Sequence, residues 1–239
     1  MRQDARTPAR PRSRRPQISL LPRADSKPRK RPKQARAQVT VEALFEAFVR
    51  IWQRDGWDKL TTRAVALEAG VAVGTLYEYF PNKLALYSGY VRYCIESLVA
   101  AVQVAAVDPE GLSWQARIHR MLQILCGLEK LPRVWLNADM YLLEPLVAEP
   151  KHQRRAHDEL LGLWRRVLAA CEDLPHPPSP QAIETLHLSV WGGRRYAIVV
   201  GLSPEETRRW AQGLEQQCFA YLESPQSAEP AQASRRMRL

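Results

Sequence analysis

Apolar residues recur at helical spacing along most of the chain, beginning near Gln38. The first such stretch has its apolar side chains three or four positions apart, at Val41, Leu44, Phe45, Phe48, Ile51 and Trp52. This spacing predicts an amphipathic helix that buries one face. Gly56 follows the stretch, and glycine favours the left-handed conformation in which helices commonly end.

Two short helices are predicted directly after this first helix. Thr61 and Thr62 begin one of them, because Thr is a favoured N-cap, and Gly70 ends it. The other covers residues 72–80 and stops at Pro81. Two short helices joined by a tight, glycine-containing turn are typical of a helix-turn-helix, whose second helix enters a DNA major groove. A helical hairpin that only packs a core has the same spacing, so the pattern alone leaves both readings open.

The remaining pattern is also helical and lacks the alternation of half-buried strands. Helices are predicted over residues 84–104, from Ser113 onward, through an apolar stripe at 160–171, and over 182–200 and 204–222. The last of these begins at Ser203-Pro204-Glu205-Glu206, a capping box with Pro at the first helical position. We therefore expect an all-α fold, with an N-terminal three-helix domain at 37–86 and a larger helical domain at 87–222.

Charge is distributed unevenly along the chain. The formal net charge is +10, but residues 1–36 hold 13 Lys or Arg and only two Asp, so the excess lies in this segment. Its six prolines oppose a stable helix, which predicts a disordered basic arm over 1–36. A solvated tail and a non-specific contact with DNA or RNA both fit the arm, whereas an organellar transit peptide fits less well. Residues 223–239, rich in Pro, Ala, Gln and Ser, are predicted to form a disordered tail.

Several functional classes receive no support from the sequence. The longest uninterrupted apolar runs are far shorter than the roughly 20 residues of a membrane-spanning helix. The four cysteines form no C-x-x-C pair, which argues against a zinc cage and predicts a reducing compartment. Each lies in an apolar helical stretch, so a buried, inert thiol is expected, with a redox sensor as the alternative.

Catalytic motifs are likewise missing from the sequence. It contains no phosphate-binding glycine loop, nucleophile elbow or zinc-protease signature. His152 and His157 are five positions apart, which does not place two metal ligands on one helical face. We therefore expect no catalytic residue, no metal site and no cofactor.

The run from Thr61 to Lys83, TTRAVALEAGVAVGTLYEYFPNK, resembles the DNA-binding domain of the tetracycline-repressor (TetR) family of bacterial transcriptional regulators. The G-T-L-Y-x-Y-F-x-x-K element is its specific part, and the resemblance covers roughly Arg31 to Leu86. It implies a cytoplasmic, nucleoid-associated bacterial regulator that binds double-stranded DNA at an inverted-repeat operator as a homodimer. It also implies a small-molecule effector that releases a repressor, although the same architecture allows an activator.

The resemblance assigns DNA contacts to particular residues. These are Thr62, Val73, Gly74, Thr75, Tyr77, Tyr79 and Lys83. By this resemblance the hydroxyl groups of Thr62, Tyr77 and Tyr79 contact phosphates, and residues 73–75 lie at base edges, where glycine permits close approach. Lys83 opens the next helix, where a cation gains little from the helix dipole, so an external phosphate is expected to bind it rather than a structural partner.

The resemblance also implies an effector pocket and a dimer interface in the larger domain. Candidate pocket residues are Met121, Trp135, Asn137, Met140, Tyr141 and Trp164, although Met and aromatic residues at helical spacing also mark an ordinary core. Candidate interface residues on the last two helices are Leu186, Val190, Gly193, Ala197, Trp210, Leu214 and Cys218. Gly192 and Gly193 inside a helix fit either close helix approach at a twofold interface or a kink.

Two other functions remain as alternatives to a sequence-specific regulator. The first is a nucleic-acid binder without sequence preference that acts through the basic arm. The second is an enzyme that transforms a small molecule in the helical domain.

Overall fold

The computed structural model describes residue 28 and residues 35–228. Most of the predicted arm, 1–36, and residues 229–239 of the predicted tail therefore lie outside the described residues. The described chain forms α1 (Ala35–Lys59), α2 (Thr62–Glu68), α3 (Val73–Tyr79), α4 (Lys83–Val102), the π-helix η1 (Gln103–Val107), α5 (Trp114–Leu125), α6 (Ala138–Leu143), the 3-10 turn η2 (Glu144–Leu146), α7 (Pro150–Ala169), α8 (Pro180–Val200), α9 (Pro204–Glu223) and η3 (Pro225–Ser227). The predicted all-α class is confirmed.

Local capping chemistry sets most of the helix ends. The Thr61 hydroxyl accepts a hydrogen bond from the Ala64 amide at 3.1 Å and starts α2. Ser203 and Glu206 form the reciprocal capping box that starts α9. Gly56 has a φ of 80° and interrupts the helical backbone near the end of α1, as its position predicts.

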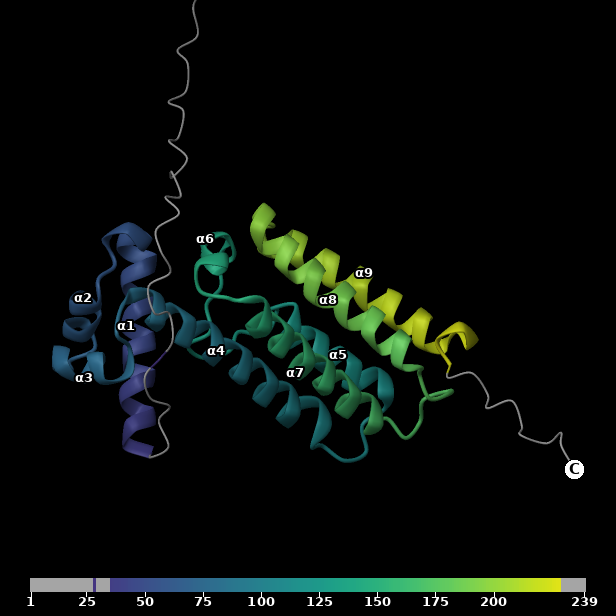
Figure 1. The fold of residues 1–239 in the computed structure, drawn as a ribbon. Helices are drawn as coiled ribbons and strands as arrows, with labels where there is room; N and C mark the ends of the chain where they lie inside the picture. Colours follow the sequence, from purple (N-terminus) through teal and green to yellow (C-terminus); the bar gives the residue numbers. More distant parts are fainter. Residues whose placement is uncertain (1–27, 29–34, 229–239) are drawn as a thin grey trace, which may run out of the picture.

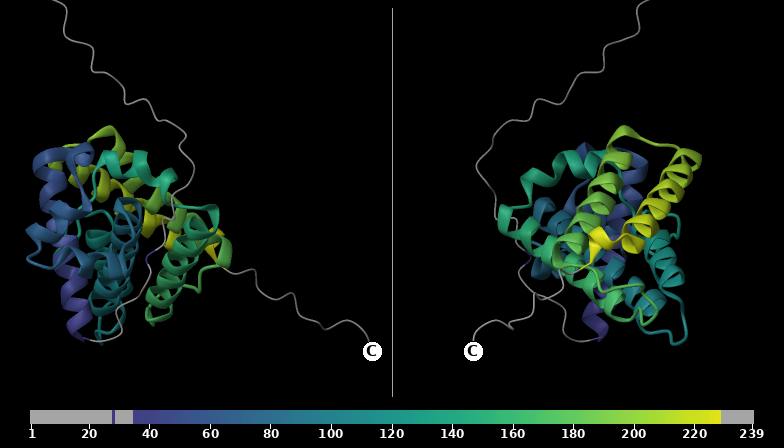
Figure 2. Two further views of the ribbon diagram at one scale, coloured as in Figure 1. Left: turned by 60° about the vertical axis from the view of Figure 1, so that its left-hand side comes forward. Right: turned by 90° about the vertical axis from the view of Figure 1, so that its right-hand side faces the viewer.

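Helix α4 connects the two ends of the molecule (Figure 1). Helices α1, α2 and α3 gather at one end, while α5, α7, α8 and α9 pack together at the other (Figures 1 and 2). Two clusters of buried side chains correspond to these ends, and α4 contributes Leu86 and Tyr90 to the first and Leu98 and Val102 to the second. The first core reaches Cys94, past the predicted domain boundary at residue 86, because α4 runs through both cores.

The segment Lys83–Val107 is long and apolar enough to cross a membrane by length and composition alone. Uninterrupted apolar runs do not reveal this, because polar residues are scattered along the segment. Only Glu96, Ala100 and Val104 within it are exposed, and its inner face contributes to both cores. The apolar composition therefore has an explanation within the fold, as that of a core helix.

The prediction that disorder begins at residue 223 is wrong for residues 223–228. The Ser227 side chain is fully buried, and its hydroxyl donates to the Ser224 carbonyl at 2.8 Å. The Ser227 carbonyl accepts from the Ser179 amide at 2.7 Å, and Pro178 and Ala228 form an isolated bridge. Composition misses this segment because its order depends on a loop more than 40 residues away in the sequence.

Candidate nucleic-acid interface

Helices α2 and α3 form a helix-turn-helix whose inner face is fixed by burial. Val65 of α2 and Leu76 of α3 are fully buried, and Phe80, directly after α3, is 3% exposed. Gly70 makes the turn between the helices with a φ of 69°. Because Leu76 and Phe80 are buried in the first core, the opposite side of α3 faces outward.

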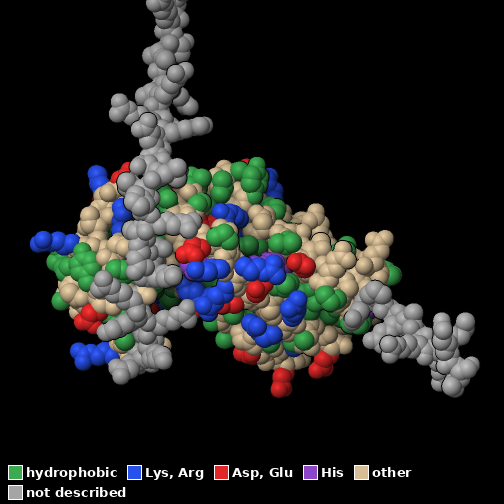
Figure 3. Space-filling view, viewed as in Figure 1, with side chains coloured by type: hydrophobic (Ala, Val, Ile, Leu, Met, Phe, Trp, Pro, Cys, Tyr) green, Lys and Arg blue, Asp and Glu red, His purple; other side chains and the backbone are tan. Residues whose placement is uncertain are grey.

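The outer side of α3 presents most of the residues expected to contact DNA. Gly74 and Tyr77 are exposed, and Val73, Thr75 and Tyr79 are partly exposed. Val73 and Tyr79 also pack against the first core, so both have a structural role as well. The exposed apolar side chains at this end of the molecule are visible in Figure 3.

Thr62 and Tyr77 are brought together across the motif. Their hydroxyl oxygens lie 3.1 Å apart, although 15 residues separate them in the sequence. Thr62 is the first residue of α2, and Thr61 rather than Thr62 is the N-cap. The pair therefore places two hydroxyl groups beside the amino end of α2, where unsatisfied backbone N–H groups favour an anion.

The fold itself does not require glycine at position 74. Gly74 lies in the first turn of α3, does not adopt a left-handed φ, and an added Cβ would meet no atom within 4 Å. A glycine that neither the backbone nor the packing demands costs helix stability without a benefit inside the molecule. The structure of the single chain therefore gives no reason for glycine at this position.

Lys83 departs from the sequence-based expectation. Its Nζ donates to the Trp57 carbonyl at 2.9 Å and lies 4.3 Å from the centroid of the Trp57 ring. Burial lowers the pKa of this ammonium, and the carboxylate of Asp58 partly offsets the effect. The expectation that a structural partner is absent is wrong, because the Trp57 carbonyl accepts from Lys83 as well as from the Leu60 amide at 3.2 Å.

Two exposed cations near the motif were missed by the sequence analysis. Lys59 ends α1, and Arg63 occupies the second position of α2, next to Thr62. By contrast, Arg50 and Arg54 both pair with Glu68, at 3.0 and 3.4 Å, and these ion pairs join α1 to α2. Adjacency to Thr62 in the sequence was the available signal for Arg63.

Comparison with known proteins agrees with this geometry. The family model "Bacterial regulatory proteins, tetR family" matches residues 44–89, which include α2, α3 and the start of α4. Residues 44–89 therefore resemble the DNA-binding domain of the TetR family. The matched region is the region in which α3 presents its outer face, whereas the helical domain beyond it is supported by fold comparison.

Curated relatives match part of the chain. Nucleoid occlusion factor SlmA of Shewanella sp. (strain W3-18-1) is 26% identical over 84 residues, which is 35% of this chain and 42% of that protein. SlmA of Shewanella woodyi is 26% identical over 105 residues, or 43% of this chain and 53% of that protein. The chain thus spans about half the length of the curated relatives it matches.

Solved structures match most of the chain at low identity. A TetR-family transcriptional regulator from Streptomyces coelicolor shares 17% identity with a TM-score of 0.54, covering 77% of this chain and 97% of that one. A TetR regulator from Haloarcula marismortui reaches a TM-score of 0.57 at 17% identity over 78% and 97%. The SmeT–triclosan complex has a TM-score of 0.53 at 17% identity and covers 84% of this chain and 100% of that one. These matches establish the fold alone.

The six residues predicted to line an effector pocket lie in different parts of the described chain. Met121 and Trp164 are buried in the second core, whereas Met140 is buried in the first and Trp135 packs against it. The Asn137 side chain accepts from the Met140 amide at 3.0 Å and caps α6. Tyr141 stacks on Arg195, whose guanidinium carbon lies 4.9 Å from the ring centroid. These side chains have structural partners within the chain, and the effector pocket at these residues stays a prediction.

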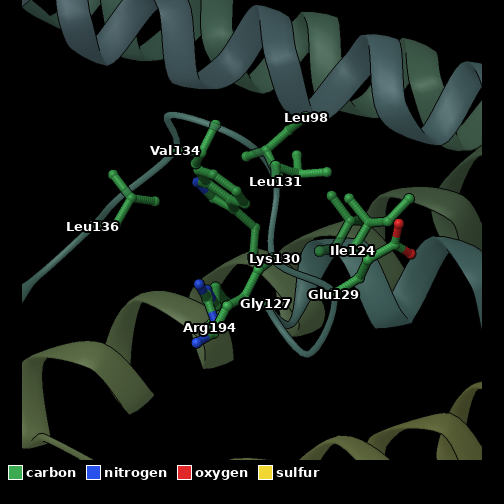
Figure 4. A pocket seen from close by; sticks show the side chains of 11 residues that line it. Leu98, Ile124, Gly127, Glu129, Lys130, Leu131, Val134, Leu136 and Arg194 are labelled. Atoms are coloured by element: carbon green, nitrogen blue, oxygen red, sulfur yellow. The ribbon is translucent and has the colours of Figure 1, made fainter. Parts of the chain in front are cut away.

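A pocket of about 80 Å³ lies elsewhere, between α4, the segment after α5, and α8 (Figure 4). Its lining residues are Leu98, Ile124, Leu125, Gly127, Glu129, Lys130, Leu131, Val134, Leu136, Trp191 and Arg194. None of the six predicted residues is among them. Sequence periodicity could not find this pocket, because much of its wall is the irregular segment 127–136.

The predicted dimer residues on α8 and α9 are largely core residues of one chain. Leu186, Val190, Ala197, Leu214 and Cys218 are at most 6% exposed. An ideal Cβ at Gly193 would lie 2.8 Å from Cζ2 of Trp210, so these two predicted residues pack against each other within the chain. These five side chains therefore contribute to the core of the single chain, and their part in a dimer interface stays a prediction.

A different face of α8 is exposed and apolar. Leu188, Tyr196, Val199 and Val200 are 53%, 69%, 39% and 48% exposed. Gly192 lies between them at helical spacing and is also exposed. These residues form one stripe along the helix, which we call the α8 stripe.

The thiol and histidine groups form no catalytic or metal constellation among the described residues. All four cysteines are buried, and burial raises the pKa of Cys94, Cys126 and Cys218 to about 12 and that of Cys171 to about 11. A thiol with such a pKa is largely protonated and unreactive at neutral pH. No group of three metal-ligating side chains occurs in the described part of the chain.

Proposed function

We propose that this chain is a sequence-specific DNA-binding transcriptional regulator of the TetR family, a repressor that a small molecule releases. The outer face of α3 carries the proposal. It offers an exposed aromatic hydroxyl at Tyr77, a side chain at Thr75 and an open approach at Gly74. Phosphate contacts at the Thr62–Tyr77 pair would fix the orientation of α3, and residues 73–75 would read base edges.

The unit that binds DNA is proposed to be a homodimer joined through the α8 stripe. Large apolar side chains exposed along one helix favour burial against another protein surface. A twofold axis places the same stripe on both copies, and Gly192 at its centre allows the two helices to approach closely. Two copies would place two α3 helices for the two halves of an inverted-repeat operator.

The loop over residues 131–137 is a physical route from the pocket to the DNA-binding end. Val134 and Leu136 line the pocket, and Trp135 between them lies 6.1 Å from the Trp52 ring of α1. The Tyr90 hydroxyl of α4 accepts from the Trp135 amide at 2.8 Å and donates to its carbonyl. A ligand that moves this loop would therefore act on both α1 and α4.

Arg133 ties the same loop to α1 by charge. Its guanidinium pairs with Glu42 at 3.2 Å and also with Glu46. The residue has a φ of 63°, an unfavourable backbone conformation for a side chain other than glycine. A ligand that prefers another loop arrangement would shift the population of DNA-binding conformers by its difference in affinity between the two states.

A second candidate function is DNA binding without sequence preference through the arm. The 13 Lys and Arg among residues 1–36 favour it, because phosphate neutralisation alone gives non-specific affinity. The SlmA relatives are named nucleoid occlusion factors, a name that refers to the nucleoid. Neither candidate function requires a catalytic step, and both place the chain in the cytoplasm on DNA.

Selection from a random DNA pool at about 150 mM salt separates the two candidates. At this ionic strength phosphate-only binding is strongly weakened, so the proposed regulator should recover a palindromic motif. Tyr77→Phe should lower affinity for that motif, whereas deletion of residues 1–30 should lower affinity for all sequences alike. Recovery of no motif, together with loss of all binding on deletion, would support the arm-driven binder instead.

A further inference from the structure

Arg194 is a partly buried cation for which the described residues provide no ion-pair partner. Burial lowers the pKa of its guanidinium. The side chains that partly offset this effect by charge interaction are Tyr141 and Cys126, and neither is a carboxylate. One of its N–H groups donates to the Cys126 carbonyl, directly after α5. Because it is costly to remove an isolated charge from water, even in part, a neighbouring anion would stabilise this guanidinium.

The chain makes room for this guanidinium with a glycine. Gly127 has a φ of 75°, and a Cβ at this position would overlap the Arg194 guanidinium. Position 127 therefore favours glycine twice, through the backbone conformation and through the space that the guanidinium occupies. The carbonyl at the end of α5 favours a cation through the helix dipole and holds the guanidinium at the pocket edge.

The pocket beside Arg194 is apolar on its other side. Leu98, Leu131 and Val134 face the space from one side, and Arg194 lies beside Gly127 on the other (Figure 4). Exposed Lys130 adds a second positive charge at the rim, and exposed Glu129 a negative one. A guanidinium opposite aliphatic side chains matches a molecule that has an anionic end and an apolar body.

The size of the pocket limits the ligand. The pocket measures about 80 Å³. A bound water occupies about 10–15 Å³ on this measure, so the space fits roughly five to eight non-hydrogen atoms. We propose that this pocket binds a small monocarboxylate with an aliphatic body, whose carboxylate pairs with Arg194 and whose chain contacts Leu98, Leu131 and Val134. This inference rests on the proposed function, because it names the chemical class of the effector.

Calorimetric titration of the full chain, without DNA, tests the inference. The probes are hexanoate and butyrate, with hexanol and hexylamine as matched ligands of similar length that lack the carboxylate. We expect hexanoate to bind at least tenfold more tightly than hexanol, since a charge-assisted hydrogen bond is lost with the alcohol. Equal affinities for hexanoate and hexanol, preferential binding of hexylamine, or binding of none of the probes would overturn the assignment.

Variants of the pocket charges make the test specific. Arg194→Gln, checked for folding by circular dichroism, should reduce hexanoate affinity to the level of hexanol. Exposed Glu129 and Lys130 give variants that do not disturb the core: Glu129→Gln should tighten hexanoate binding about twofold to threefold, and Lys130→Ala should weaken it similarly. If Arg194→Gln does not fold, the opposite changes in hexanoate affinity of the Glu129 and Lys130 variants test the inference instead. Affinity changes in the same direction, or no change in either variant, would refute the pairing of the carboxylate with Arg194.

The outcome is separable from that of the proposed function. Carboxylate binding without any selected DNA motif would support the carboxylate site and contradict the proposed function as a sequence-specific regulator. A selected motif without carboxylate binding would do the reverse.

Discussion

Replacement of Gly74 by Ala tests whether α3 is approached closely from outside. The added methyl group would meet nothing within 4 Å, and the backbone is helical rather than left-handed. Alanine is favoured over glycine in helix interiors by about 0.5–1 kcal/mol, and position 74 lies in the first turn, so we expect a gain of about 0.5 kcal/mol in the free energy of unfolding. The protein without DNA should therefore become slightly more stable.

DNA affinity should change in the opposite direction. A methyl group between the backbone of α3 and a base edge would displace the helix from the groove, and loss of one good base contact costs about 1–3 kcal/mol. We expect the Kd for the selected operator to rise about tenfold, which corresponds to about 1.4 kcal/mol. Urea denaturation at fixed protein concentration measures the first quantity, and fluorescence anisotropy with labelled operator measures the second.

Gly162→Ala provides the matched control. Gly162 lies within α7, and a Cβ there would make only an ordinary contact with Arg166 at 3.7 Å. This variant should gain about 1 kcal/mol of stability and leave the operator Kd unchanged. If both variants gain stability and neither changes the operator Kd, the small size of Gly74 has no role in DNA binding, and the reading of this face is refuted.

Three further predictions concern the helical domain. Tyr196→Asp should convert the dimer to a monomer in analytical ultracentrifugation, because it places a charge in the α8 stripe. The control Val104→Asp, at a side chain 68% exposed on η1, should leave the dimer intact. A Tyr196→Asp variant that remains dimeric would contradict the proposed interface. Gly193→Ala should lower the free energy of unfolding by about 1–3 kcal/mol, because the methyl group must displace Trp210; unchanged urea unfolding would show that the ring moves freely. Burial and the neighbouring imidazole lower the pKa of His187 to about 4, so this histidine is neutral in the folded chain while the unfolded chain takes up a proton below about 6.5. The free energy of unfolding is therefore highest above pH 6.5 and falls as the pH is lowered towards 4, with a loss of about 2 kcal/mol at pH 5. His187→Gln should flatten the pH dependence of the free energy of unfolding over that range. An unchanged slope in the variant would contradict this prediction.

The helix boundaries and the DNA-binding motif could be predicted because they depend on short-range chemistry. A cap such as Thr61 or Ser203 acts on backbone groups within three residues, and Gly56 acts on its own backbone angle. The motif from Thr61 to Lys83 is likewise continuous in the sequence. Its outward-facing residues follow once Leu76 and Phe80 are assigned to the inner side.

The use of α8 could not be predicted in the same way. The helix has apolar residues on more than one face, with Leu186 and Val190 on one and Leu188 and Tyr196 on another. Periodicity gives the spacing of a stripe but does not say which stripe meets the core of the same chain. The structure places the first pair against the core and leaves the second exposed.

The sequence by itself determined that the chain is helical, where most of its helices begin, and that it contains a TetR-type helix-turn-helix. Only the tertiary structure decided that Lys83 binds the Trp57 carbonyl, that Arg194 lies over Gly127 at the edge of a pocket, and that the predicted pocket residues are divided between two cores. The physical reason is range. Caps and helical periodicity operate within one or two turns, whereas these contacts join residues 26 to 68 positions apart, and their formation depends on how the helices pack.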